Sequence, residues 1–136
     1  MAYGTSVTID RPFDEAVTAV REALAEQGFG VLTEIDVQAT MKQKLDHDME
    51  PYLILGACNP PLAKRGLDAE ISLGLLLPCN VVVRSAGDRT VVEVLDPQTM
   101  VRLTDNDQLK PVADEAAARL AATLDALQQG TFDPSR

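Results

Sequence analysis

The chain has 136 residues and a net charge of −9, from 12 Lys and Arg residues against 21 Asp and Glu residues. This length is typical of one domain, and a hydrophobic fraction of 46% with a charged fraction of 24% is typical of a folded chain rather than a disordered one. The acidic balance argues against nucleic acid as a partner, because phosphate binding needs a basic face. The sequence does not by itself reveal a function.

Periodicity in the first half of the chain predicts alternating strands and helices. Residues 3–10 alternate as a strand does, and a helix that Pro12 opens at its first position and Gly28 ends should follow. The buried stripe of this helix is predicted as Phe13, Val17, Val20 and Leu24. The next elements are predicted as a strand over 30–36, a helix over 37–45, a strand over 52–58 and a short helix over 62–67.

The second half is predicted to form a β-hairpin and then two helices. The hairpin joins strands over 79–84 and 89–95, and a short helix after Asp96-Pro97 runs to about Leu103. The last helix covers about 109–128, with a buried stripe of Val112, Ala116, Leu120, Leu124 and Leu127.

This order, β-α-β-α-β-α-β-β-α-α, predicts an α+β fold. We expect a single compact domain over 1–130, with about five strands in one mixed or antiparallel sheet and helices packed on it, and a frayed tail over 131–136.

A stretch of 13 residues without a charged side chain covers residues 71–83. It is too short to span a bilayer, which needs about 20 apolar residues, so we expect it in the core and expect no membrane partner. The first residues lack the basic and apolar regions of a signal peptide. We therefore expect a cytoplasmic protein in which Cys58 and Cys79 are reduced thiols.

Several common catalytic and metal-binding patterns are missing from the sequence. There is no glycine-rich phosphate loop, no Gly-x-Ser-x-Gly, no Cys-x-x-Cys and only one histidine, His47, in a polar loop where a solvated side chain is favoured over a catalytic triad. Glu34 and Asp36 point to one face of their predicted strand. They suit acid–base or hard-metal chemistry, but carboxylates at a solvent-facing strand end are the favoured interpretation. We predict no metal ion and no cofactor.

The two cysteines share one sequence setting, in which each is followed by Asn and lies near Pro at an element boundary. Asn59 is expected to cap a helix, because the proline after it favours an extended backbone. Cys58 then precedes a helix N-terminus, which favours a thiolate. Cys79 begins a strand that could lie beside the 52–58 strand. Neighbouring thiols could hold a soft monovalent metal, carry sulfur or cycle as a redox pair; the favoured interpretation is that both fill the core.

Five segments of the sequence together resemble a known family. They cover residues 11–17, 28–37, 52–60, 74–81 and 94–97. In this order they resemble the domain-of-unknown-function 302 family, over about residues 3–128 of the chain. The resemblance implies a small α+β domain of a mostly bacterial and archaeal family, and homodimers. It brings no established activity and no catalytic residues.

The first functional hypothesis is a small-ligand-binding or interaction module, acting as a homodimer and without its own catalysis. Its pocket is expected where the 52–58 strand, the Asn59-capped helix and residues 75–83 converge. The predicted site residues are Tyr52, Leu55, Cys58, Asn59, Leu76, Cys79 and Asn80. The alternative is a thiol protein that handles sulfur, redox equivalents or a soft metal through Cys58 and Cys79. A hydrolase built on Glu34 and Asp36 is a third option.

Overall fold

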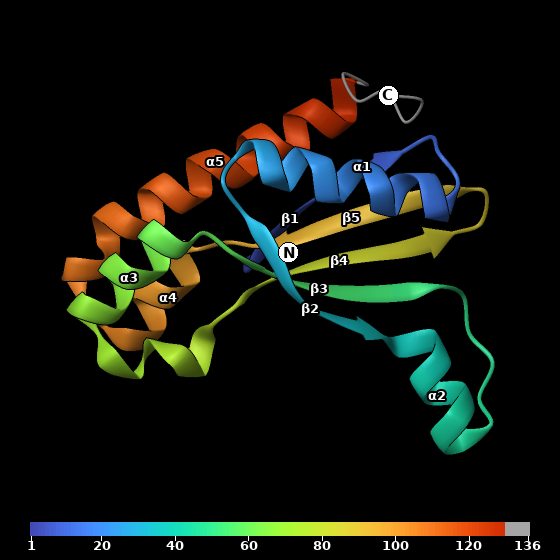
Figure 1. Ribbon diagram of the computed structural model, residues 1–136, viewed down its shortest axis with the longest axis horizontal. Helices are drawn as coiled ribbons and strands as arrows, with labels where there is room; N and C mark the ends of the chain where they lie inside the picture. Colours follow the sequence, from blue (N-terminus) through green and yellow to red (C-terminus); the bar gives the residue numbers. More distant parts are fainter. Residues whose placement is uncertain (130–136) are drawn as a thin grey trace.

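The computed structural model describes residues 1–129, which form one five-stranded antiparallel sheet and the helices around it (Figure 1). The strands are β1 Gly4–Ile9, β2 Gly30–Asp36, β3 Tyr52–Cys58, β4 Cys79–Ala86 and β5 Arg89–Leu95, in the sheet order β1-β5-β4-β3-β2. The helices are α1 Phe13–Glu26, α2 Val37–Leu45, α3 Pro60–Ala69, α4 Gln98–Thr104 and α5 Lys110–Gln129, with short 3-10 helices η1 Ile71–Leu76 and η2 Asp107–Leu109. The predicted α+β fold is confirmed, and the predicted tail lies outside the described residues.

Helices α1 and α5 cover one face of the sheet, which we call the inner face (Figure 1). All five residues of the predicted α5 stripe are buried. In α1 the prediction holds for Val20 and Leu24, but Ala16, Ala19 and Ala23 complete the buried face, while Phe13 and Val17 are only partly buried. Short alanine side chains let this helix lie close to the sheet beside Val20 and Leu24, whereas Phe13 and Val17 pack at the margin of the core.

The two ends of α1 follow backbone rules that the sequence largely predicts. Gly28 has a φ of 82°, the left-handed conformation expected of the glycine that ends a helix. Pro12, predicted as the first helical residue, is the N-cap instead, because its ψ of 156° is extended. The Pro12 carbonyl still accepts the first helical hydrogen bond, from the Ala16 N–H at 3.0 Å.

Within the part of the chain that the structure describes, no helix covers the centre of the opposite face of the sheet, which we call the outer face. Helix α2 lies at one end of this face, and α3, η1 and α4 lie together at the other (Figure 1). Side chains at the outer face come from alternate residues of each strand, and the register aligns Ile35, Ile54, Val82, Glu93 and Ser6 in one row across the sheet. The sheet therefore has one face packed against α1 and α5 and one face whose centre no described helix covers.

A β-bulge and a glycine shape the edge of the sheet at β2 and β3. The register shifts between Val31 and Thr33, so Leu32 is the extra residue and is 68% exposed. Thr33 then packs over Gly56, where a methyl group would also lie 2.7 Å from Pro78 Cγ. Gly56 is the residue that lets these segments approach each other.

Two segments are less buried than the sequence predicts. Helix α2 has the predicted bounds but no buried residue, because it projects beyond the sheet and packs mainly against β3. The first part of the uncharged stretch expected in the core forms η1, which buries Leu73 while Ile71 and Leu75 are 83% and 89% exposed; the last part begins β4, where Cys79, Val81 and Val83 are buried as expected. The tight 3-10 turn points these side chains in different directions. Within residues 1–129, no helix has the length and apolar character needed to cross a membrane.

Candidate functional site

The end of β3 and the start of β4 lie side by side, with Ala57 paired to Cys79. The predicted adjacency of these two strands is therefore confirmed. Cys58 and Cys79 both line one cavity of about 40 Å³. The remaining lining includes Leu62 and Ala63 of α3, Leu73 of η1, Met100 of α4, and Val112 and Ala116 of α5. Because every major element at this end of the molecule contributes to it, we call this the sulfur cavity.

The size of the sulfur cavity restricts what it can hold. Pockets for small organic molecules have volumes of about 300–1,000 Å³, whereas this one has about 40 Å³. It has room for an ion or a few water molecules but not for an organic ligand. Its walls are almost entirely apolar side chains, so any charge inside would have to be neutralised by the thiols.

The two thiols differ in burial and in acidity. Neither cysteine is in a disulfide; Cys58 is half-buried and Cys79 is 9% exposed. Burial raises the pKa of the Cys79 thiol, and the charge of a Cys58 thiolate close to it raises that pKa further. Cys79 is therefore a protonated thiol near neutral pH, which makes it a poor nucleophile.

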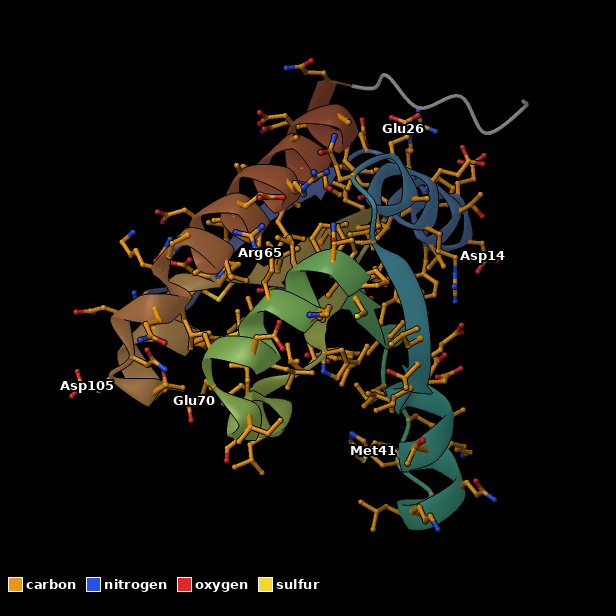
Figure 2. All side chains as sticks on the ribbon, turned by 60° about the vertical axis from the view of Figure 1, so that its left-hand side comes forward. Asp14, Glu26, Met41, Arg65, Glu70 and Asp105 are labelled. Atoms are coloured by element: carbon orange, nitrogen blue, oxygen red, sulfur yellow. The ribbon has the colours of Figure 1, made fainter. Side chains whose placement is uncertain are left out.

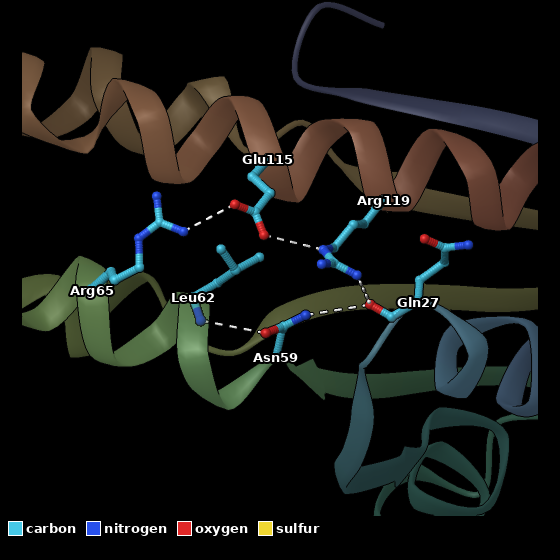
Figure 3. Close-up of polar contacts among 6 residues, drawn as sticks. All are labelled: Gln27, Asn59, Leu62, Arg65, Glu115 and Arg119. Carbon is cyan, nitrogen blue, oxygen red and sulfur yellow. Dashed lines mark hydrogen bonds and ion pairs between the residues drawn. The ribbon is translucent and has the colours of Figure 1, made fainter.

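Asn59 fixes the N-terminus of α3 through both the oxygen and the nitrogen of its side-chain amide (Figure 3). Its Oδ1 accepts from the Leu62 N–H at 3.3 Å, so the predicted N-cap is confirmed. Its Nδ2 donates to the Gln27 carbonyl at 3.3 Å, and that carbonyl also accepts from Arg119 Nη1 at 3.2 Å. A single carbonyl at the end of α1 thus ties α3 to α5.

The same network extends along the surface of α5. Arg119 Nε also pairs with Glu115 at 3.3 Å, and Glu115 pairs with Arg65 of α3 at 3.0 Å (Figure 3). The Arg65 guanidinium, and then Arg119, hold the pKa of Glu115 below its usual value. These exposed pairs position α3 over the sulfur cavity and do not enter it.

The seven predicted site residues do not form one pocket. Cys58, Asn59 and Cys79 line the sulfur cavity. Leu55 is fully buried in the main core on the inner face, and Leu76 packs against the cluster of Leu73, Met100 and Leu109. Tyr52 and Asn80 lie on the outer face, because strand residues alternate in direction.

Tyr52 and Asn80 instead line a hollow of about 230 Å³ on the outer face. Its walls come from β1, β3, β4 and β5, with Met1 at its margin. They include Tyr3, Val82, Glu93 and Leu95. The sequence prediction joined two places that lie on opposite sides of the same strands.

The acidic residues and the histidine considered in the sequence have ordinary structural roles. Glu34 forms an ion pair with Arg21 of α1, and Asp36 Oδ1 accepts from the Ala39 N–H at 2.9 Å as the N-cap of α2. His47 is exposed in the loop after α2. Residues 1–129 contain no cluster of three or more His, Cys, Asp or Glu side chains suited to a metal ion.

Among the residues that sequence reasoning missed, Met100 lines the sulfur cavity and Arg119 supports it from outside through the Gln27 carbonyl. Both come from helices far along the chain, so no local pattern gives a signal for them. Gly56 had a signal, because a glycine inside a predicted strand marks a close approach of another segment.

Comparison with known proteins supports the resemblance found in the sequence. A family model described as Domain of unknown function DUF302 matches residues 5–127. The chain is also similar to a solved structure described as the crystal structure of an uncharacterized conserved protein DUF302 from Bacillus stearothermophilus. The identity is 30% and the TM-score 0.87, covering 94% of this chain and 100% of that one. No curated protein matches this chain.

Proposed function

Because the chain belongs to the DUF302 family, whose description assigns no activity, we propose a function from its own geometry. The protein is an interaction module that pairs with a second copy of itself through the outer face of its sheet, without its own catalysis. The observation that carries this proposal is the open sheet face itself, which combines apolar side chains with little charge.

The outer face carries apolar side chains along its central row and at one edge. Ile54 and Val82 are half-buried at its centre, Ile35 is 50% exposed beside them, and Tyr3 is 62% exposed at the edge of the hollow. An antiparallel sheet face that stays in water usually carries polar side chains. Contiguous exposed apolar side chains mark surfaces that contact other molecules.

Charge distribution favours a second copy of this chain as the occupant. Of the 21 acidic residues, the five strands hold three, Glu34, Asp36 and Glu93, and only Glu93 lies on the outer face. Figure 2 shows Asp14, Glu26, Glu70 and Asp105 at the periphery of the molecule, on or beside helices. Two copies that each carry −9 repel least when they meet through the face with the fewest acidic groups.

The ion pair between Arg84 and Glu93 on the outer face suits a symmetric contact. Arg84 Nε lies 2.9 Å from Glu93 Oε1, with opposite charges side by side on neighbouring strands. A two-fold axis close to this pair would set each residue beside its opposite charge on the second copy, as an isologous interface requires. The second copy would also fill the hollow lined by Tyr52 and Asn80.

Sedimentation equilibrium at micromolar concentration tests the proposed dimer. The wild-type chain should sediment at 2 × 14.7 kDa. Val82→Lys and Ile35→Lys should sediment as monomers with unchanged circular dichroism, because two copies would each place ammonium groups at the contact. Leu103→Lys is the matched control, since Leu103 is an exposed apolar residue on α4 and not on a strand of the sheet. A monomeric wild type, or dimeric Val82→Lys and Ile35→Lys variants, would contradict the proposal.

A thiol function is a second proposal with its own support. Cys58 and Cys79 line the same cavity, and the half-buried Cys58 gives that cavity a side near solvent. Free thiols persist in a reducing compartment, so we also propose the cytoplasm as the location. Alkylation of the native protein tests the thiol proposal: at least the Cys58 thiol should react without denaturant, and two unreactive thiols would overturn it.

A further inference from the structure

Three sulfur-containing residues from distant parts of the chain line the sulfur cavity. Cys58 of β3, Cys79 of β4 and Met100 of α4 all line it. They include both cysteines of the protein and one of its four methionines. Two thiols and a thioether that line one small cavity are a ligand set with a definite chemical preference.

We infer that the sulfur cavity binds one soft monovalent cation of the Cu(I) type, held by the thiolates of Cys58 and Cys79 and the thioether of Met100. The inference rests on the thiol function proposed above and is independent of the proposed dimer. Thiolate and thioether sulfur select soft ions such as Cu(I). The lining contains no carboxylate and no imidazole, so it lacks the ligands that hard and borderline divalent ions prefer.

The size and walls of the cavity fit a bare ion. Its volume of about 40 Å³ exceeds the space of one water molecule but is far below that of an organic ligand. A cation in such an apolar site is stable only if nearby groups neutralise it. Two thiolates supply this charge: the ion enters, two S–H bonds break, two metal–sulfur bonds form and two protons leave to solvent. The resulting bis-thiolate complex carries one negative charge.

The arrangement also suggests an order of binding. Cys58 is half-buried, whereas Cys79 and Met100 are 9% and 5% exposed. An incoming ion therefore meets Cys58 first, and then Cys79 and Met100 complete its coordination away from water.

Anaerobic competition titration tests the site. The reduced full-length protein is titrated with tetrakis(acetonitrile)copper(I) against a chromophoric Cu(I) chelator. Native mass spectrometry then gives the number of copper ions bound per chain. We expect one Cu(I) per chain, two protons released per ion, and no uptake of Zn(II) at the same concentration. A wild-type protein that fails to compete, or that takes up Zn(II) equally well, would overturn the inference.

Single substitutions identify the ligands. Cys58→Ala and Cys79→Ala should each weaken Cu(I) binding by at least about 100-fold, because loss of even a supporting residue typically costs 10–100-fold. Met100→Leu should weaken it by about 10-fold, whereas Met49→Leu, outside the cavity, should not change it. If Met100→Leu binds as tightly as Met49→Leu, the three-sulfur site is wrong.

A measurement on the wild type covers the case in which a cysteine variant does not fold. One equivalent of Cu(I) should protect both thiols from N-ethylmaleimide, as read by intact mass. Alkylation of both thiols at the same rate with and without Cu(I) would contradict the metal site, and yet leave the broader thiol function standing because the thiols react. Native thiols that neither react nor bind Cu(I) would overturn both.

Discussion

Substitution of Asn59 tests how much its two hydrogen bonds stabilise the structure around the sulfur cavity. In Asn59→Ala the Leu62 N–H loses its partner, and the Gln27 carbonyl keeps only Arg119 as donor. Loss of an N-cap costs about 1 kcal/mol, and loss of a buried hydrogen bond costs about 1 kcal/mol more. We expect the free energy of unfolding to fall by about 2 kcal/mol, which lowers the melting temperature by about 6–8 °C in a domain of this size.

Asn59→Ser separates these two contributions. A serine hydroxyl caps a helix about as well as asparagine, but it is too short to reach the Gln27 carbonyl from the same backbone position. Its cost should therefore be about 1 kcal/mol. Both variants are measured by urea unfolding followed by circular dichroism. The reasoning fails if Asn59→Ser is as destabilising as Asn59→Ala, or if Asn59→Ala costs less than about 0.5 kcal/mol.

Three further predictions follow from packing and charge. Gly56→Ala should lower the free energy of unfolding by about 1–3 kcal/mol, because the new methyl group would lie 2.7 Å from Pro78 Cγ; an unchanged urea midpoint would refute the close contact. The lowered pKa of Glu115 stabilises the fold above its unfolded value near 4.5, and this contribution is lost as pH falls through the lower folded value. Arg65→Gln should therefore reduce the loss of stability on acidification, and unfolding curves between pH 5 and 3 that are parallel to wild type would count against the ion pair. At pH 7 iodoacetamide should modify Cys79 more slowly than the other cysteine, since Cys79 is more buried and its pKa is raised; equal rates by peptide mapping would disagree with this geometry.

Local rules explain most of the elements that the sequence predicts. The bounds of β2, α2, β3 and β5 agree with the prediction, because turn residues and alternation mark their ends. Asn59 was predicted as a cap from the proline that follows it, and Gly28 as a helix terminator from its place after the α1 stripe; both are confirmed. Each of these features depends on residues within a few positions along the chain.

Features that depend on tertiary packing were harder to predict. Helix α2 packs against β3 but buries none of its residues, and Leu45 is exposed. Met100 and Arg119 join the sulfur cavity and its supporting network only because α4 and α5 fold back against α3. Sequence patterns predict that a helix is amphipathic, but not which element its apolar side meets.

The residues predicted to form one site lie at two places in the structure, because side chains alternate along strand β4. Cys79 and Asn80 are neighbours in β4, and their side chains point to opposite faces of the sheet. Cys79 therefore lines the sulfur cavity, whereas Asn80 lines the hollow on the outer face. A sequence-based prediction that groups residues by their proximity along the chain places such a pair in one pocket.

This alternation makes the two proposals separable by adjacent substitutions. Asn80→Lys adds a charge to the outer face and leaves the sulfur ligands in place, so it should abolish the dimer and preserve Cu(I) binding. Cys79→Ala removes a ligand behind the sheet, so it should abolish Cu(I) binding and preserve the dimer. Sedimentation and copper titration of both variants check this. If each variant changed both properties while its circular dichroism stayed native, the outer face and the sulfur cavity would act as one coupled site, since β4 is the strand they share.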